Sequence, residues 1–194
     1  MAKDDQQEAF ERALSSALTR VIDFIKFAEA KNAALLTFSS AWIIGSVNFL
    51  TSDKPVSPLW RMSFTAAVPI FTAAAIIAIL SFIPKTNLGR LHKDPERAKS
   101  LLYFGDAATF EPSAFRDRIR ERYYPPDGES AARNYLDDLS VQIAVNSQIA
   151  DRKFSYFNTG ALFVLAALTL FLPPAFKAIW DMILTLLPPA GASQ

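Results

Sequence analysis

Charged and uncharged residues alternate in long blocks along the chain, and three of the uncharged blocks are long enough to cross a lipid bilayer as helices. Residues 32–52, 62–84 and 154–173 contain no Lys, Arg, Asp or Glu. At about 1.5 Å of rise per residue, each block matches the roughly 30 Å of hydrocarbon in a bilayer. Pro69 lies inside the second block, where a membrane helix tolerates it with a kink. The pattern predicts three transmembrane helices.

Two of these spans are predicted to continue as helices beyond the bilayer. Ahead of the first span, apolar residues recur at helical spacing, at Phe10, Leu14, Ala17, Val21, Ile25 and Ala28. No helix breaker follows before Asn32, and none lies between Ser130 and Pro173. The predicted fold is therefore an all-α integral membrane protein with a helical cytoplasmic module, in which long helices are continuous with the spans.

The segment between the second and third spans is predicted to hold two shorter helices. Pro95 can open a helix that runs through Phe110, and Pro112 can open another through Tyr123. Residues 125–128, Pro-Pro-Asp-Gly, then break the chain. No period-two alternation is long enough to predict a strand.

The tail after the third span is predicted to be amphipathic. Pro173 and Pro174 should stop or bend the span. Beyond them, apolar residues at helical spacing occupy one side and polar residues the other. An interfacial helix over 175–187 fits this pattern best, and a bent continuation of the third span is the alternative, because thirteen residues are too few for another crossing.

The distribution of basic residues predicts how the chain is oriented. Residues 85–153 hold twelve of the twenty Lys and Arg, whereas the link 51–60 holds only Lys54. The positive-inside rule therefore places 85–153 and the N-terminus in the cytoplasm and the C-terminus outside. The predicted division is an amphipathic cytoplasmic helix 1–31, spans 32–52, 62–84 and 154–173, a helical sensor module 85–153, and the tail helix 175–187.

The composition excludes several kinds of function. A net charge of +1 gives no electrostatic reason to expect a nucleic-acid polymer as partner, although a small phosphate ligand remains possible. Without cysteine and with His92 as the only histidine, no metal site is expected. No nucleotide-loop, metalloprotease or hydrolase motif is present, and the spans carry no charge. We therefore expect no catalytic residues, no cofactor and no enzyme activity.

A polar stripe on the last long helix is the most informative candidate site. Residues three or four apart share one face of a helix, and here they are Tyr135, Asp138, Gln142, Asn146, Ile149 and Lys153. The two amides, flanked by an acid, a tyrosine and a lysine, could hydrogen-bond a nucleobase edge or fix a neighbouring helix. The second interpretation, a ladder between helices, is slightly favoured. Glu29, Lys31 and Asn32, at the entry to the first span, could simply place their charges at the membrane interface.

Three stretches together resemble the membrane effectors of the bacterial Pycsar anti-phage systems. They are 27–37, FAEAKNAALLT; 101–107, LLYFGDA, with Tyr103 and Asp106; and 135–153, with Leu139, Gln142, Ile143, Asn146, Ser147 and Ile149. Their order and spacing match as well. The resemblance covers most of the chain, from about Phe27 to the third span.

This resemblance implies a dormant inner-membrane protein. A partner cyclase would make cyclic CMP or cyclic UMP on phage infection, and the effector would then assemble as a homo-oligomer and impair the lipid bilayer. The resemblance by itself assigns no ligand contact. Glu29, Lys31, Asn32, Tyr103, Asp106, Tyr135, Asp138, Gln142, Asn146 and Lys153 are the matched positions that could offer a hydrogen bond or a charge.

Two other interpretations stay open at this point. A ligand-independent membrane scaffold or accessory subunit would bind no cyclic pyrimidine nucleotide. A small transporter or lipid-acting enzyme is disfavoured, because the spans are uncharged and no catalytic cluster is present.

Overall fold

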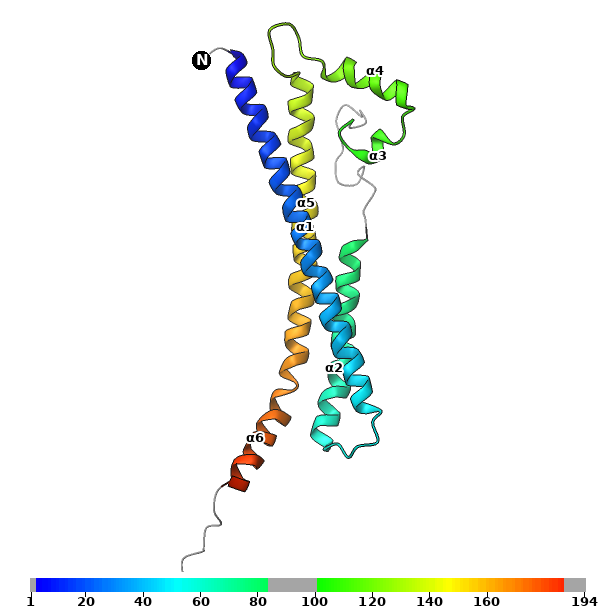
Figure 1. Cartoon of the computed structure of the whole chain (residues 1–194), viewed down its shortest axis with the longest axis vertical. Helices are drawn as coiled ribbons and strands as arrows, with labels where there is room; N and C mark the ends of the chain where they lie inside the picture. The colour runs from blue at the N-terminus through cyan, green and yellow to red at the C-terminus, as the bar shows by residue number, and fades with distance from the viewer. Residues whose placement is uncertain (1–2, 84–100, 187–194) are drawn as a thin grey trace, which may run out of the picture. The chain divides into compact units, whose positions relative to one another are not determined.

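The computed structural model describes residues 3–83 and 101–186, and these residues form helices and turns without a strand. The helices are α1 (Lys3–Leu50), α2 (Pro58–Phe82), α3 (Phe104–Ala107), α4 (Pro112–Tyr123), α5 (Arg133–Thr169) and α6 (Leu172–Leu186), labelled in Figure 1. Three helical stretches are long and apolar enough to cross a membrane: Asp4–Leu50, Pro58–Phe82 and Arg133–Leu186. The predicted all-α class with three membrane-spanning helices is confirmed.

Both long helices continue past the spans, as predicted, and α1 has a seven-residue repeat in its burial. Its buried residues are Ala28, Asn32, Leu35, Ser39 and Ser46. They belong to a row of positions spaced alternately three and four apart, as at the contact face of a coiled coil. We call this row the seam of α1. Phe10, which the sequence placed on the apolar face, is exposed and lies outside this row.

The chain divides into two compact units. The first comprises Met1–Glu29 and Ile83–Phe154, and the second comprises Ala30–Phe82 and Ser155–Gln194. The divisions fall within two residues of the predicted membrane entries at 31/32 and 153/154. The depth at which each helix enters the bilayer stays a prediction.

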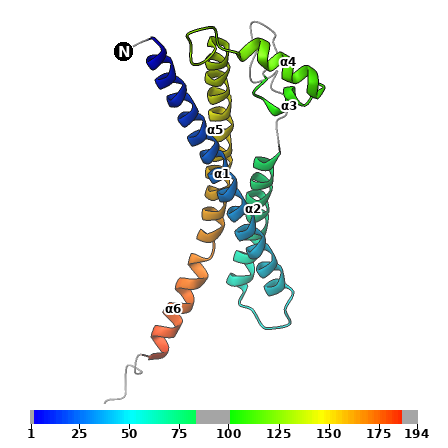
Figure 2. The ribbon, with the colours of Figure 1, turned by 45° about the horizontal axis from the view of Figure 1, so that its top comes forward.

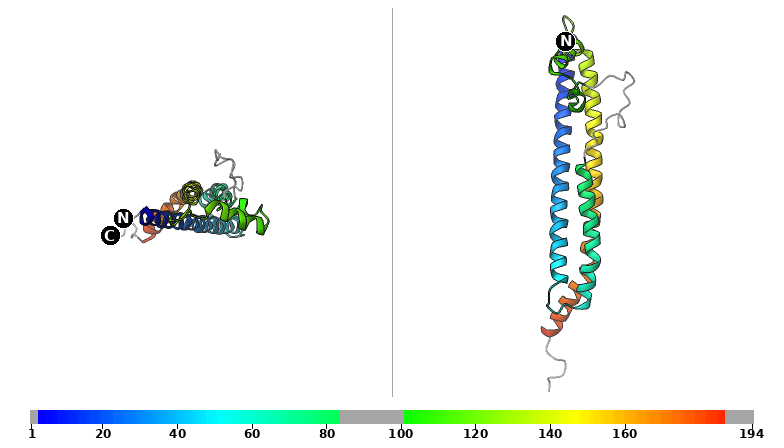
Figure 3. Two further views of the ribbon diagram at one scale, coloured as in Figure 1. Left: turned by 90° about the horizontal axis from the view of Figure 1, so that it is seen from above. Right: turned by 90° about the vertical axis from the view of Figure 1, so that its right-hand side faces the viewer.

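In the second unit, α2 lies alongside the second half of α1 (Figures 2 and 3). The core consists of Ala67, Phe71 and Ala167, and the Trp42 ring stacks on Phe71 and on Phe171 at centroid distances of 5.5 and 5.3 Å. Pro69 lies inside α2 without ending it, as expected.

The prolines after the third span bend the chain, as the sequence indicated. Helix α5 ends at Thr169, and α6 begins at Leu172, three residues before the predicted start at residue 175. Pro173 and Pro174 therefore lie in the first turn of α6. The first N–H groups of a helix have no intrahelical acceptor, so proline is tolerated there. The bend is visible between α5 and α6 in Figures 1 and 2, and α6 contacts α2.

One predicted helix is wrong over its described part. A helix was expected through Phe110, but residues 101–110 contain only the four-residue α3. The Asp106 carbonyl accepts hydrogen bonds from the Thr109 N–H and hydroxyl at 3.0 and 2.7 Å, a turn that competes with helix continuation. The helix expected from Pro112 through Tyr123 is confirmed as α4. Residues 84–100, including Pro95 and His92, lie outside the described residues.

Candidate functional site

Asp138, at the centre of the predicted polar stripe, is held by two side chains of α4. Arg122 donates through Nε and Nη2 to the two carboxylate oxygens at 2.8 and 2.9 Å, and the Tyr123 hydroxyl donates to Oδ2 at 2.5 Å. The Arg122 and Asp138 side chains are each 16% exposed. A bidentate pair of this kind is geometrically specific. The Asp138 carboxylate thus fastens α4 to α5 within the first unit, which matches the helix-fixing interpretation for this residue.

The electrostatics of this cluster keep each member in its ordinary charge state. Burial raises the pKa of Asp138, but the hydrogen bonds from Arg122 and Tyr123 outweigh burial and hold that pKa below its usual value. Burial and the bond to Asp138 raise the pKa of Tyr123, and the bond to Asp138 raises the pKa of Arg122. The cluster is therefore an ion pair with a neutral phenol at physiological pH.

Gln142 joins two of the three family-like stretches. Its Nε2 donates to the Leu102 carbonyl at 3.1 Å, and the adjacent Leu101 is 4% exposed. The stretch 101–107 is thereby fixed to α5. Within that stretch, the Tyr103 carbonyl accepts from the Asp106 and Ala107 N–H groups at 3.1 and 2.9 Å.

Tyr135 and Asn146 are the stripe residues whose polar groups are least committed. Both are half-buried. The Tyr135 ring meets the Tyr123 ring edge-on at 5.8 Å. In the described ranges 3–83 and 101–186, neither the Tyr135 hydroxyl nor the Asn146 amide makes a hydrogen bond.

Lys153 pairs with Glu29, which joins the first and third stretches. Lys153 Nζ lies 3.0 Å from Glu29 Oε1, and the Lys153 side chain is 9% exposed, whereas that of Glu29 is 46% exposed. Next to this pair, the Phe27 and Phe154 rings lie 6.2 Å apart. The ion pair ties α1 to α5 within the first unit.

The remaining candidates, Lys31 and Asn32, belong to the second unit. Lys31 Nζ lies 5.0 Å from the Phe157 ring centroid, within range of a cation–π contact. Asn32 is fully buried on the seam of α1. Of the ten predicted positions, eight therefore lie in the first unit and two in the second.

Arg152 is a polar residue of the first unit that sequence reasoning missed. Its Nε atom is buried and has no hydrogen-bond partner within the part of the chain that the structure describes. A guanidinium N–H in this state attracts anionic oxygen. The sequence offered no reason to single out Arg152, because its neighbour Lys153, and not Arg152, has the helical spacing of the stripe.

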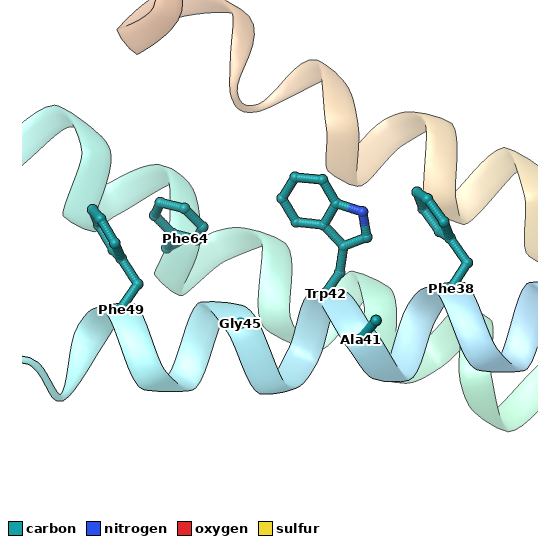
Figure 4. A pocket seen from close by; sticks show the side chains of 6 residues that line it. All are labelled: Phe38, Ala41, Trp42, Gly45, Phe49 and Phe64. Atoms are coloured by element: carbon teal, nitrogen blue, oxygen red, sulfur yellow. The ribbon is translucent and has the colours of Figure 1, made fainter.

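An apolar hollow of about 400 Å³ lies in the second unit (Figure 4). Its lining residues are Phe38, Ala41, Trp42, Gly45 and Phe49 of α1 and Phe64 of α2. Transfer of a charged phosphate into an apolar lining is strongly unfavourable. This hollow is therefore no site for a nucleotide. Among the described residues, no group of three His, Asp or Glu side chains could hold a metal ion.

Comparison with known proteins decides the family. A family described as "Pycsar effector protein domain" matches residues 13–180. The chain belongs to the Pycsar effector family. It is also 40% identical, over 167 residues, to "Pycsar effector protein RsPycTM" of a Rhizobium species, an alignment that covers 86% of this chain and 95% of that one. No solved structure matches.

Family membership confirms the resemblance inferred from the three stretches. The chain is a transmembrane effector of Pycsar anti-phage defence, and it works in a membrane context with a partner cyclase. The Pycsar effector family is one of transmembrane effectors and not of enzymes.

Proposed function

We propose that this Pycsar effector binds a cyclic pyrimidine mononucleotide, cyclic CMP or cyclic UMP, through the first unit, then rearranges as a homo-oligomer and impairs the integrity of the bacterial inner membrane. The observation that carries the proposal is the spacing of two groups on one face of α5. The Asn146 amide makes no hydrogen bond within residues 3–83 and 101–186, and seven residues later Lys153 has an ammonium group paired with Glu29.

The two groups suit the two ends of such a ligand. A cyclic mononucleotide has one negative charge on its phosphodiester and a pyrimidine edge with hydrogen-bond donors or acceptors. The Asn146 amide can both donate and accept, and the Lys153 ammonium is a point charge for phosphate oxygen. Seven residues correspond to about 10 Å of helix rise, comparable to the length of the ligand.

Binding would compete with an existing contact. A phosphodiester at Lys153 Nζ takes the place of the Glu29 carboxylate, which lies 3.0 Å away and is half exposed. Because Glu29 is on α1 and Lys153 is on α5, the exchange loosens the tie between the two helices. A ligand that prefers the loosened state shifts the population by its differential affinity for the two states. Both helices continue without interruption into the second unit.

The proposed impairment of the membrane requires several copies of the chain, because three spans are few to enclose a pore. Gly45 lies in the first span, is exposed, and has no atom within 4 Å of where a Cβ would be. Its lack of a side chain therefore serves no packing within the described chain. Together with Ala41, one turn earlier, it leaves room for the close approach of a helix from another copy.

The test replaces both amides of the stripe. Gln142→Ala/Asn146→Ala should abolish the loss of membrane potential that follows phage infection in cells carrying the partner cyclase, while membrane insertion is unchanged. Ser147→Ala is the matched control, because Ser147 is exposed and its hydroxyl, among the described residues, bonds only the Ile143 carbonyl of its own helix. A normal response in the double variant would remove the stripe from the mechanism.

A further inference from the structure

A row of buried polar side chains follows one face of α1 in the second unit. Asn32, Ser39 and Ser46 are fully buried and spaced seven residues apart, about 10 Å of helix rise each. A seven-residue spacing keeps them on the same face of the helix. The apolar Leu35 and Trp42 lie between them on that face, so polar and apolar side chains alternate along the seam.

The hydroxyls of Ser39 and Ser46 differ from other hydroxyls of the spans. Those of Thr37, Thr65, Thr72 and Thr159 each donate to a carbonyl one turn back on their own helix, at 2.8 to 3.0 Å. Ser39 Oγ and Ser46 Oγ have no hydrogen-bond partner among residues 3–83 and 101–186. A buried hydroxyl without a partner is unfavourable, and water is the simplest molecule that could satisfy it.

We propose that the row Asn32, Ser39 and Ser46 is the path by which water and small ions cross the bilayer when the effector is active. In the structure the apolar side chains of this face are packed within the unit: Leu35 is buried, and the Trp42 ring is stacked against Phe71 and Phe171. Separation of the helices along this face would hydrate the two hydroxyls at once. The row carries no charged side chain, so the path selects weakly between cations and anions.

This inference rests on the proposed function for its trigger, and the absence of cysteine from the chain makes it testable. Ser39→Cys and Ser46→Cys are nearly isosteric single substitutions, and Ile44→Cys is the matched control, because Ile44 is 61% exposed on another face of α1. Each full-length variant is reconstituted in dye-loaded vesicles and treated with a charged, membrane-impermeant methanethiosulfonate, with and without cyclic CMP or cyclic UMP.

The expected result is that nucleotide speeds labelling at residues 39 and 46 by about tenfold or more, an ordinary size for an allosteric shift, and leaves residue 44 unchanged. Dye release without labelling at 39 and 46 would overturn the inference and leave the proposed function standing. Vesicles of the unsubstituted chain that stay tight with both nucleotides would instead refute the proposed function.

A second variant tests the seam without nucleotide. Ser39→Asp places a carboxylate in the row, which should draw water into the seam and release dye unprompted, whereas Ile44→Asp puts the same charge outside it. Leakage with Ser39→Asp alone supports the path. Tight vesicles, with the variant shown to be inserted and helical by flotation and circular dichroism, would overturn it.

Discussion

At the scale of single residues, the polar stripe contains groups that hold the first unit together and groups that make no hydrogen bond within the described residues. Asp138 and Gln142 are committed to Arg122, Tyr123 and the Leu102 carbonyl. The Asn146 amide has no such bond within the described chain. Spacing alone could not separate these roles, because the partners of Asp138 lie 15 and 16 residues away in sequence and the partner of Gln142 lies 40 residues away.

Asp138→Asn should lower the thermal stability of the first unit, because Arg122 loses its charged acceptor at a position where both side chains are only 16% exposed. A hydrogen bond to a charged group contributes about 2 kcal/mol, and this is the expected loss in free energy of unfolding. Asp137→Asn is the control, since that carboxylate is 69% exposed and 3.9 Å from Arg133. Thermal unfolding in detergent, followed by circular dichroism, measures both; equal effects would contradict the assignment.

The Arg122–Asp138 ion pair also predicts that the stability of the first unit depends on pH. The folded pKa of Asp138 lies below its ordinary value, so its contribution to stability is complete at neutral pH and is lost as pH falls below about 4 and through the folded pKa. The gap in melting temperature between the unsubstituted chain and Asp138→Asn should therefore narrow as the pH is lowered. A gap that stays constant between about pH 7 and pH 3 would show that the carboxylate charge contributes nothing.

At the scale of helices, the sequence predicted the long elements well and the short ones less well. Lys3–Leu50 and Arg133–Thr169 follow from uninterrupted apolar periodicity, and Pro112 marked the start of α4. The turn at Asp106 and Thr109 was missed, since a side-chain bond to a nearby carbonyl leaves no periodic signal. The contacts of Asp138 and Gln142 depend on tertiary packing, which no helical periodicity encodes.

Close packing in the second unit gives a prediction for a pair of glycines. A Cβ on Gly160 would lie 2.6 Å from Leu35 Cδ2 and 3.6 Å from the Ala74 carbonyl, so a large side chain there would collide with the Leu35 side chain and press on the α2 backbone. Gly160→Leu should destabilise the unit by about 1–3 kcal/mol through overpacking. Gly45→Leu should be tolerated, because its Cβ position is open. Melting temperatures in detergent compare them, and a tolerated Gly160→Leu would refute the close approach.

At the scale of the whole molecule, charge segregation predicts the orientation of the chain. Twelve of the twenty basic residues lie in 85–153, between the second and third spans. A reporter fused after Gln194 should therefore be active on the periplasmic side, and one inserted at Asp127 on the cytoplasmic side. A cytoplasmic signal after Gln194 would mean a fourth crossing or an inverted third span.

The central claim is that the first unit senses a cyclic pyrimidine nucleotide. Isothermal titration of the detergent-purified full-length chain with cyclic UMP, with cyclic CMP, and with cyclic AMP as control tests it most directly. The account predicts saturable binding of one cyclic pyrimidine nucleotide and none of cyclic AMP. If a folded protein gives no binding heat with any of the three, the account is contradicted, and a ligand-independent scaffold becomes the better description.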